Sequence, residues 1–155
     1  MVGMLPTTGS YSHTIIAVSD MSRSIDWYQR VFGFEVLNRT KIDSRLMDDI
    51  TGLSNASVDM VRGYVGNLLI ELIETHCDGD LPENRAPGTV TGMTISVENV
   101  ARCYDLARDN GIDIESPPSV FGVYSSMLIR DPDGVTFDLT DYQGQDPHEY
   151  LGANE

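Results

Sequence analysis

The feature that most constrains this chain is an internal repeat. Residues 13–26 align with residues 92–105, a separation of 79 positions, and a second match 67 positions apart places Glu71 over Asp138. The identical pairs in the first match include Ile16 and Ile95, Val18 and Val97, Arg23 and Arg102, and Asp26 and Asp105. A pattern that recurs in this way predicts two copies of one supersecondary unit.

Each copy opens with the same order of local signals. A short β-branched apolar run is followed by a capping residue, Asp20 or Asn99, and then by apolar residues at helical spacing. The helical pattern ends at Gly33 in one copy and at Gly111 in the other, and glycine suits the left-handed position that follows a helix. Each copy therefore begins with a strand and a helix.

Three extended stretches complete each copy. Residues 34–40 and 112–116 follow the two helices, and turn signals at 66–67 and 131–134 each join two further strand-like runs as a hairpin. The unit is βαβββ, so the sequence predicts an α+β fold of two tandem βαβββ modules that form a shared cleft. We expect a single domain over residues 1–155, with module one at about 11–75, module two at about 90–142 and a polar tail at 143–155.

The two matches differ in spacing, which places about a dozen extra residues in module one, near positions 41–57. Apolar Leu46, Met47, Ile50 and Leu53 lie among polar residues in this insertion. A long connection of this kind in a compact domain is often functional, and we expect it to be a lid over a pocket.

Charge and apolar content limit the partners. The 24 acidic residues outnumber the 10 basic ones, for a formal charge of −14, which disfavours binding to nucleic acid or to an anionic membrane. The first dozen residues lack the features of a secretion signal, and no run approaches the roughly 18 apolar residues of a membrane span. We expect a cytoplasmic protein in which Cys77 and Cys103, two isolated thiols, are reduced and structural.

One carboxylate stands out in the strand pattern of residues 68–74. Glu71 shares its face with Leu69 and Ile73, and a carboxylate among apolar neighbours is costly unless it is paired, protonated or bound to a metal. The alternative is a glutamate on an edge strand that faces water. Asp138 repeats the placement in the second copy, between two threonines.

Together these motifs resemble one known superfamily. The start HTIIAVSDM at His13, the helix segment SIDWY, the FGF exit at 32–34 and the RDPDG hairpin at 130–134 are similar to the vicinal oxygen chelate superfamily. That superfamily includes glyoxalase I, methylmalonyl-CoA epimerase, extradiol dioxygenases, fosfomycin-inactivating transferases and bleomycin-binding proteins. The resemblance covers about residues 11–142 and implies a cleft that commonly holds a divalent metal.

The resemblance also implies a set of ligands and catalytic groups. By position, the metal ligands are His13, Glu71 and Asp138, and the fourth ligand position holds Gly92, which has no side chain to offer. Three ligands could still bind zinc, nickel, cobalt, manganese or iron with open positions for water and substrate, or they could be relics. The carboxylates of Glu71 and Asp138, with His13, are the candidate acid and base groups.

Two functions follow from these residues. The first is an isomerase, epimerase or lyase of specialised metabolism that acts on an oxygenated, carbonyl-containing metabolite by carboxylate-mediated proton transfer, with or without help from a metal. The second is a metal-free member of the superfamily, either a ligand-sequestering protein of the bleomycin-resistance type or a metal-free acid-base catalyst. Gly92 disfavours an extradiol dioxygenase, whose metal is held by two histidines and a carboxylate. The expected partners are a small molecule and a second copy in a homodimer.

Weaker candidates for the pocket are polar or aromatic residues whose ordinary roles are packing or solvation. Arg45 precedes the apolar part of the insertion, Tyr64 and Tyr124 fall in corresponding strands, and Trp27 lies on the first helix, where a place in the core or an interface is favoured. His76 and His148 are expected at the surface.

Overall fold

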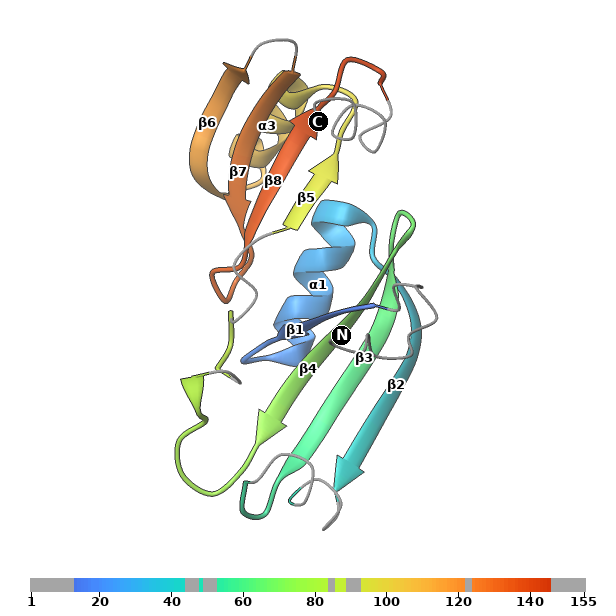
Figure 1. Cartoon of the computed structure of the whole chain (residues 1–155), viewed down its shortest axis with the longest axis vertical. Coiled ribbons are helices and arrows are strands. Elements are labelled where there is room, and N and C mark those ends of the chain that lie inside the picture. Colours follow the sequence, from blue (N-terminus) through green and yellow to red (C-terminus); the bar gives the residue numbers. More distant parts are fainter. Residues whose placement is uncertain are drawn as a thin grey trace, which may run out of the picture.

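The structure is a computed structural model of the chain (Figure 1). It describes residues 13–43, 48, 53–83, 86–88, 93–121 and 124–145, with the side chains of Asp43, Phe121 and Tyr124 left aside.

In the described part of the chain, module one consists of a four-stranded sheet and the helix α1, as the repeat predicts. We call its sheet, of order β1-β4-β3-β2, sheet A; β1 runs parallel to β4 and the other neighbours are antiparallel. Its elements are β1 (Thr14–Ala17), α1 (Met21–Phe32), β2 (Glu35–Asp43), β3 (Ser57–Val65) and β4 (Leu68–His76).

Module two repeats this topology. Its sheet, sheet B, has the order β5-β8-β7-β6, again with the first strand parallel to the last. Its elements are β5 (Met93–Ser96), α3 (Val100–Asp109), β6 (Asp113–Phe121), β7 (Tyr124–Arg130) and β8 (Thr136–Asp141). Ile15 pairs with Glu71 in sheet A as Thr94 pairs with Asp138 in sheet B, which confirms the duplication residue by residue.

The helix ends follow the local signals. The side chain of Asp20 accepts a hydrogen bond from the Arg23 backbone nitrogen at 2.9 Å, and Gly33 ends α1 in the left-handed conformation with φ 65°. Asn99 caps α3 in the same way. The second helix ends at Asp109 with Asn110 as its cap, and Gly111, the next residue, takes the expected left-handed conformation with φ 66°.

One hydrophobic core runs through both modules, and α1 joins them. Figure 1 shows sheet B above sheet A along the long axis, with α1 in the middle. Trp27 and Tyr28 of α1 are buried in this core, with ring centroids 6.0 and 5.8 Å from that of Phe137 on β8. The preferred role for Trp27, a core residue, is confirmed.

Polar contacts fix the turn between β7 and β8 against α1. The buried Tyr28 hydroxyl donates to Asp131 at 2.9 Å, and the Ser19 backbone nitrogen donates to Asp133 at 3.0 Å, as does Arg23 at 3.2 Å. Burial raises the pKa of the Asp131 carboxyl above its ordinary value, and burial beside Asp131 also raises the pKa of Tyr28. Tyr28 therefore stays a donor to the Asp131 carboxyl.

The two cysteines are free thiols, as predicted, and burial raises the pKa of Cys103. Neither α1 nor α3, the helices in the described part of the chain, is long and apolar enough to cross a membrane.

Candidate functional site

One side of sheet A packs on α1 and the other side does not. Ile16, Val61, Ile70 and Leu72 are fully buried in the core with α1, so the residues that alternate with them point the opposite way. We call this second surface the open face of sheet A. It carries Ile15, Met60, Arg62, Tyr64, Leu69, Glu71 and Ile73.

A buried carboxylate lies at the centre of the open face. Glu71 is 4% exposed, on a strand with neighbours on both sides, so the alternative of an edge-strand glutamate facing water is wrong. Arg62 donates from Nε to Glu71 Oε2, and His13 Nε2 lies 3.9 Å from Glu71 Oε1. Of the three states that the sequence allowed for Glu71, the structure shows pairing.

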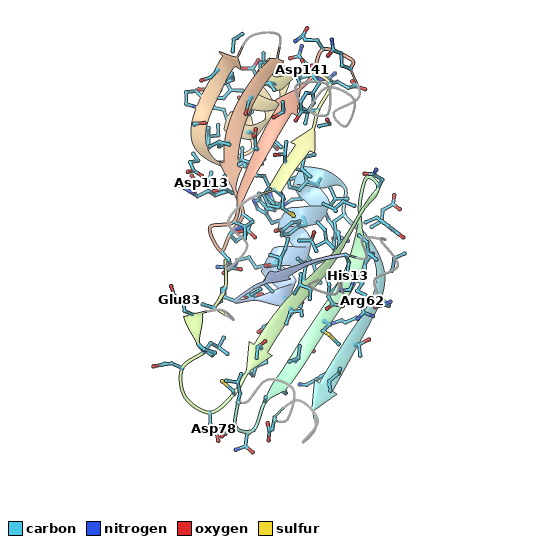
Figure 2. All side chains as sticks on the ribbon, in the orientation of Figure 1. His13, Arg62, Asp78, Glu83, Asp113 and Asp141 are labelled. Atoms are coloured by element: carbon cyan, nitrogen blue, oxygen red, sulfur yellow. The ribbon has the colours of Figure 1, made fainter. Side chains whose placement is uncertain are left out.

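Arg62 is a site residue that was not predicted from the sequence, although a signal for it exists. The β3–β4 hairpin turns at Gly66 and Asn67, and counting back from this two-residue turn places Arg62 directly opposite Glu71. The side chain of Arg62 is 40% exposed, so its guanidinium shields the buried carboxylate on one side and meets solvent on the other. Figure 2 shows His13 and Arg62 near each other on the lower module.

Asp138 occupies the matching place in sheet B with different neighbours. Its Oδ1 accepts hydrogen bonds from the hydroxyls of Ser126 and of Thr140, the latter at 2.9 Å. Across the parallel pair, Thr94 stands where Ile15 stands in sheet A. Two hydroxyls therefore hold Asp138, whereas an arginine and a histidine approach Glu71.

The structure brings together two of the three predicted metal ligands. His13 and Glu71 meet on sheet A, while Asp138 lies on sheet B. Among the described residues there is no group of three or more His, Cys, Asp or Glu side chains that could hold one ion. Gly92 lies outside the described residues.

The resemblance makes a divalent metal a plausible cofactor of this fold, yet the described residues of one chain do not fit it. One oxygen of Glu71 is already bound by a guanidinium, whose positive charge repels a cation. A site built on His13, Glu71 and Asp138, and the shared cleft predicted around them, would need Asp138 of a second copy. That ligand set stays a prediction, and we derive no chemical step through a metal.

The weaker candidates separate into three groups. Tyr64 lies on the open face and is partly exposed, two positions from Arg62. His76 is exposed and contacts Glu74 at 3.2 Å, which confirms it as a surface residue. Arg45, His148 and the side chain of Tyr124 lie outside the described residues.

The end of the predicted insertion packs on the open face. Leu53 and Ala56 form a small apolar cluster with Ile42, Val58, Met60 and Ile73. Met60 and Ile73 pair in register one step along the same face from Arg62 and Glu71. The apolar residues Leu46, Met47 and Ile50 fall outside the described residues, so the lid stays a prediction.

A separate apolar cavity of about 400 Å³ lies between α3, the end of α1 and sheet B. Its lining includes Cys103 and Leu106 but none of His13, Glu71 and Asp138. Because it lacks a paired acid or base, we place the chemistry at the open face of sheet A and not in this cavity.

Two βαβββ modules in tandem, with a carboxylate at the same register position in each, define the class of this protein as a vicinal oxygen chelate fold. Residues 10–139 match the model of the glyoxalase/bleomycin resistance protein/dioxygenase superfamily. The chain belongs to this superfamily, and the resemblance drawn from its motifs is confirmed.

Curated relatives carry the name of an enzyme. The chain is 26% identical over 131 residues to a lactoylglutathione lyase of Escherichia coli O157:H7, covering 82% of this chain and 88% of that protein. It is 24% identical over 131 residues to a lactoylglutathione lyase of Arabidopsis thaliana, covering 83% of this chain and 43% of that longer protein.

Solved structures share the fold. A glyoxalase family protein from Bacillus cereus matches with a TM-score of 0.70 at 16% identity, over 90% of this chain and 98% of that chain. The trypanothione-dependent glyoxalase I of Leishmania major matches with a TM-score of 0.61 at 22% identity, over 92% of this chain and 91% of that one. These structures establish the α+β tandem fold.

Proposed function

We propose that this protein is a small-molecule lyase or isomerase that moves a proton on the carbon next to a carbonyl group, with Glu71 as the proton carrier. The observation that carries the proposal is the buried carboxylate at the centre of the open face, bound by Arg62 at one oxygen and approached by His13 at the other. Relatives named lactoylglutathione lyase support the reaction class.

The two oxygens of Glu71 have different tasks in this proposal. Arg62 fixes Oε2, so Oε1, which faces His13, is the oxygen that takes the proton. The C–H electron pair then moves into the carbonyl and gives an enol or enolate. Return of the proton to the same carbon gives an epimer. Where that carbon also carries a hydroxyl, the intermediate is an enediol; the proton can then return to the former carbonyl carbon while the hydroxyl loses its proton and becomes the new carbonyl, which gives an isomer. His13, 3.9 Å away, is placed to exchange that proton with Glu71 or solvent.

The apolar neighbours of Glu71 support a role in proton transfer. Leu69 and Ile73 flank it on the same strand, and Ile15 lies beside it on β1. Such neighbours limit the number of water molecules that compete with a bound substrate for the carboxylate. A carboxylate needed only for folding could be replaced by an apolar residue at this position, without the cost of burying an ion pair.

We also propose that the protein works as a homodimer. Val36 and Leu37 of β2 in sheet A are large apolar residues that are about half exposed in the single chain. A second copy that covers them would bury apolar surface. Light scattering of the purified protein tests this, with a mass of one chain as the contrary result.

Ligand sequestration without catalysis is the second candidate. It is favoured by the Arg62–Glu71 pair, which neutralises the carboxylate and leaves a surface that could bind a ligand without reacting. Binding of carbonyl compounds without any turnover would support it over the enzyme.

The test of the enzymatic proposal is turnover. We would measure lactoylglutathione formation from methylglyoxal and glutathione, and incorporation of solvent deuterium into simple carbonyl metabolites by NMR. Glu71→Gln keeps the shape of the side chain and removes its basicity, so it should abolish both signals. Glu98→Gln, at an exposed position outside the open face of sheet A, makes the same change in charge and should leave them unchanged. Equal turnover by both variants would overturn the role of Glu71.

A further inference from the structure

We propose that Arg62 recognises the ligand and that the substrate is an α-keto acid with an apolar side chain: its carboxylate binds Arg62, and its keto group lies beside Glu71. This inference rests on the proposed function, because it names the substrate class of the same site.

The geometry of the Arg62 guanidinium suits a ligand carboxylate. Arg62 uses Nε to hold Glu71, and its terminal nitrogens make no hydrogen bond to another described residue. A guanidinium carries five N–H donors in a planar fork that matches the two oxygens of a carboxylate. With 40% of its side chain exposed, Arg62 can bind Glu71 behind it and a ligand carboxylate in front.

The charge at the centre of the open face differs from the charge of the chain as a whole. The chain as a whole carries −14, yet the polar groups in contact at the centre of the open face are one carboxylate, one guanidinium and one imidazole. The Glu71 and Arg62 charges offset each other, so the centre of this face is close to neutral. An anionic ligand is thus drawn to this face in preference to the acidic surface elsewhere.

Apolar surface lies next to the Arg62–Glu71 pair. Met60 and Ile73 lie side by side one step along β3 and β4, each only partly buried, and Ile15 is half exposed beside Glu71. A ligand that reaches from Arg62 past Glu71 would rest its remaining atoms on these side chains. A charged head with an apolar tail fits this order of groups, and a keto group between them places the acidic C–H near Glu71.

An arginine that only neutralised Glu71 inside the fold would show no preference among ligands. Calorimetry with α-ketoisocaproate and with its methyl ester separates the two roles, because esterification removes the charge of the carboxyl group and adds only one methyl group. We expect the acid to bind wild-type protein at least about tenfold more tightly than the ester, as a charge-assisted bidentate contact requires.

The variants locate the preference. Arg62→Ala should bind acid and ester alike, and Arg62→Lys, which keeps a positive partner for Glu71, should retain only part of the preference because it lacks the planar fork. Arg39→Ala is the matched control: Arg39 pairs with Val61 on the same sheet but on its other side, and its loss changes the net charge equally. The control should keep the wild-type preference.

The outcomes also separate this inference from the proposed function. Glu71→Gln should keep the preference for the acid while it loses deuterium exchange at the carbon beside the keto group. A wild-type protein that prefers the acid but never exchanges would refute the proposed function and support the role of Arg62. Equal affinity for acid and ester, binding of neither probe, or an undiminished preference in both Arg62 variants would overturn the inference.

Discussion

Glu71 and Asp138 hold the same register position in two copies of one module, and their surroundings show how the copies differ. Glu71 is buried and contacts Arg62 and His13. Asp138 instead accepts hydrogen bonds from the hydroxyls of Ser126 and Thr140. A duplicated strand therefore preserves the carboxylate without preserving its partners. The reactivity of such a group depends on the side chains opposite it, so we assign the chemistry to sheet A.

The two helices also differ in their contacts: α1 is buried between the modules more deeply than α3. Trp27 of α1 is 7% exposed, and Leu106, its counterpart 79 positions later in α3, is 52% exposed. Tyr28 likewise bonds Asp131 in the other module, while its counterpart is Ala107. The reason is position: aromatic rings of α1 pack on β8 of the other module, whereas the main contacts of α3 are with β6, β7 and β8 of its own sheet. Module one thus carries the candidate site, and its helix α1 makes contacts with module two.

The largest difference should appear in activity. Glu71→Gln should lower turnover by about a hundredfold to ten-thousandfold, the range for loss of a general acid-base group. Asp138→Asn keeps the oxygen that accepts both hydroxyls and should change turnover by less than about tenfold. Steady-state kinetics of the two variants, with circular dichroism to confirm folding, checks this. Equal losses would show that the two copies share the chemistry.

A second contrast concerns stability. Trp27→Ala should lower the free energy of unfolding by about 3 to 5 kcal/mol, because a large side chain is removed from the core that joins the modules. Leu106→Ala, at the matching but exposed position, should cost about 1 kcal/mol or less. Urea unfolding followed by circular dichroism measures both. Similar costs would mean that α3 has a partner that covers it.

A third contrast tests the bond from α1 to the second module. Tyr28→Phe removes the donor to the buried Asp131 and should cost about 1 to 3 kcal/mol. Tyr104→Phe removes the hydroxyl of a half-buried tyrosine on α3 and should stay within about 0.5 kcal/mol. Urea unfolding followed by circular dichroism measures the cost of both substitutions. A neutral Tyr28→Phe would show that the hydroxyl contact adds little to the packing between modules.

The smallest effect is a pH dependence. Burial raises the pKa of Asp131 in the folded state, so the folded protein binds this proton more tightly than the unfolded chain does. The contribution of this proton to stability is present below the ordinary aspartate pKa and is lost as pH rises through the raised pKa.

The change Asp131→Asn should remove this part of the pH profile. The difference in unfolding free energy between wild type and variant, measured from acid to neutral pH, should therefore vary across that window. A difference that is constant with pH would contradict the assignment.

Local signals were enough to predict most of the fold. The caps Asp20 and Asn99 and the turns at 66–67 and 131–134 depend on neighbours within a few residues, and each occurs as expected. The buried position of Glu71 also followed from alternation along one strand. Each of these features can be read from a short window of sequence.

Two aspects of the site depend on contacts distant in sequence. Arg62 is nine positions from Glu71, and recognising it required the register of the hairpin and not only the composition of its strands. The separation of Asp138 from His13 and Glu71 depends on how the modules pack, which Phe137 and the Tyr28–Asp131 bond help to fix. Tyr28 lies over a hundred residues from Asp131 and Phe137 in the sequence. The alignment of the two copies therefore could not show that Glu71 and Asp138 lie at separate places.

The most direct test of the account is solvent-deuterium exchange into α-ketoisocaproate by protein freed of metal with a chelator. We would compare wild type, Glu71→Gln and Asp138→Asn under identical conditions. If Glu71 is the proton carrier, metal-free wild type and Asp138→Asn should exchange at similar rates, and Glu71→Gln should not exchange. Exchange that requires added zinc or nickel, and that Asp138→Asn loses as completely as Glu71→Gln, would contradict this expectation.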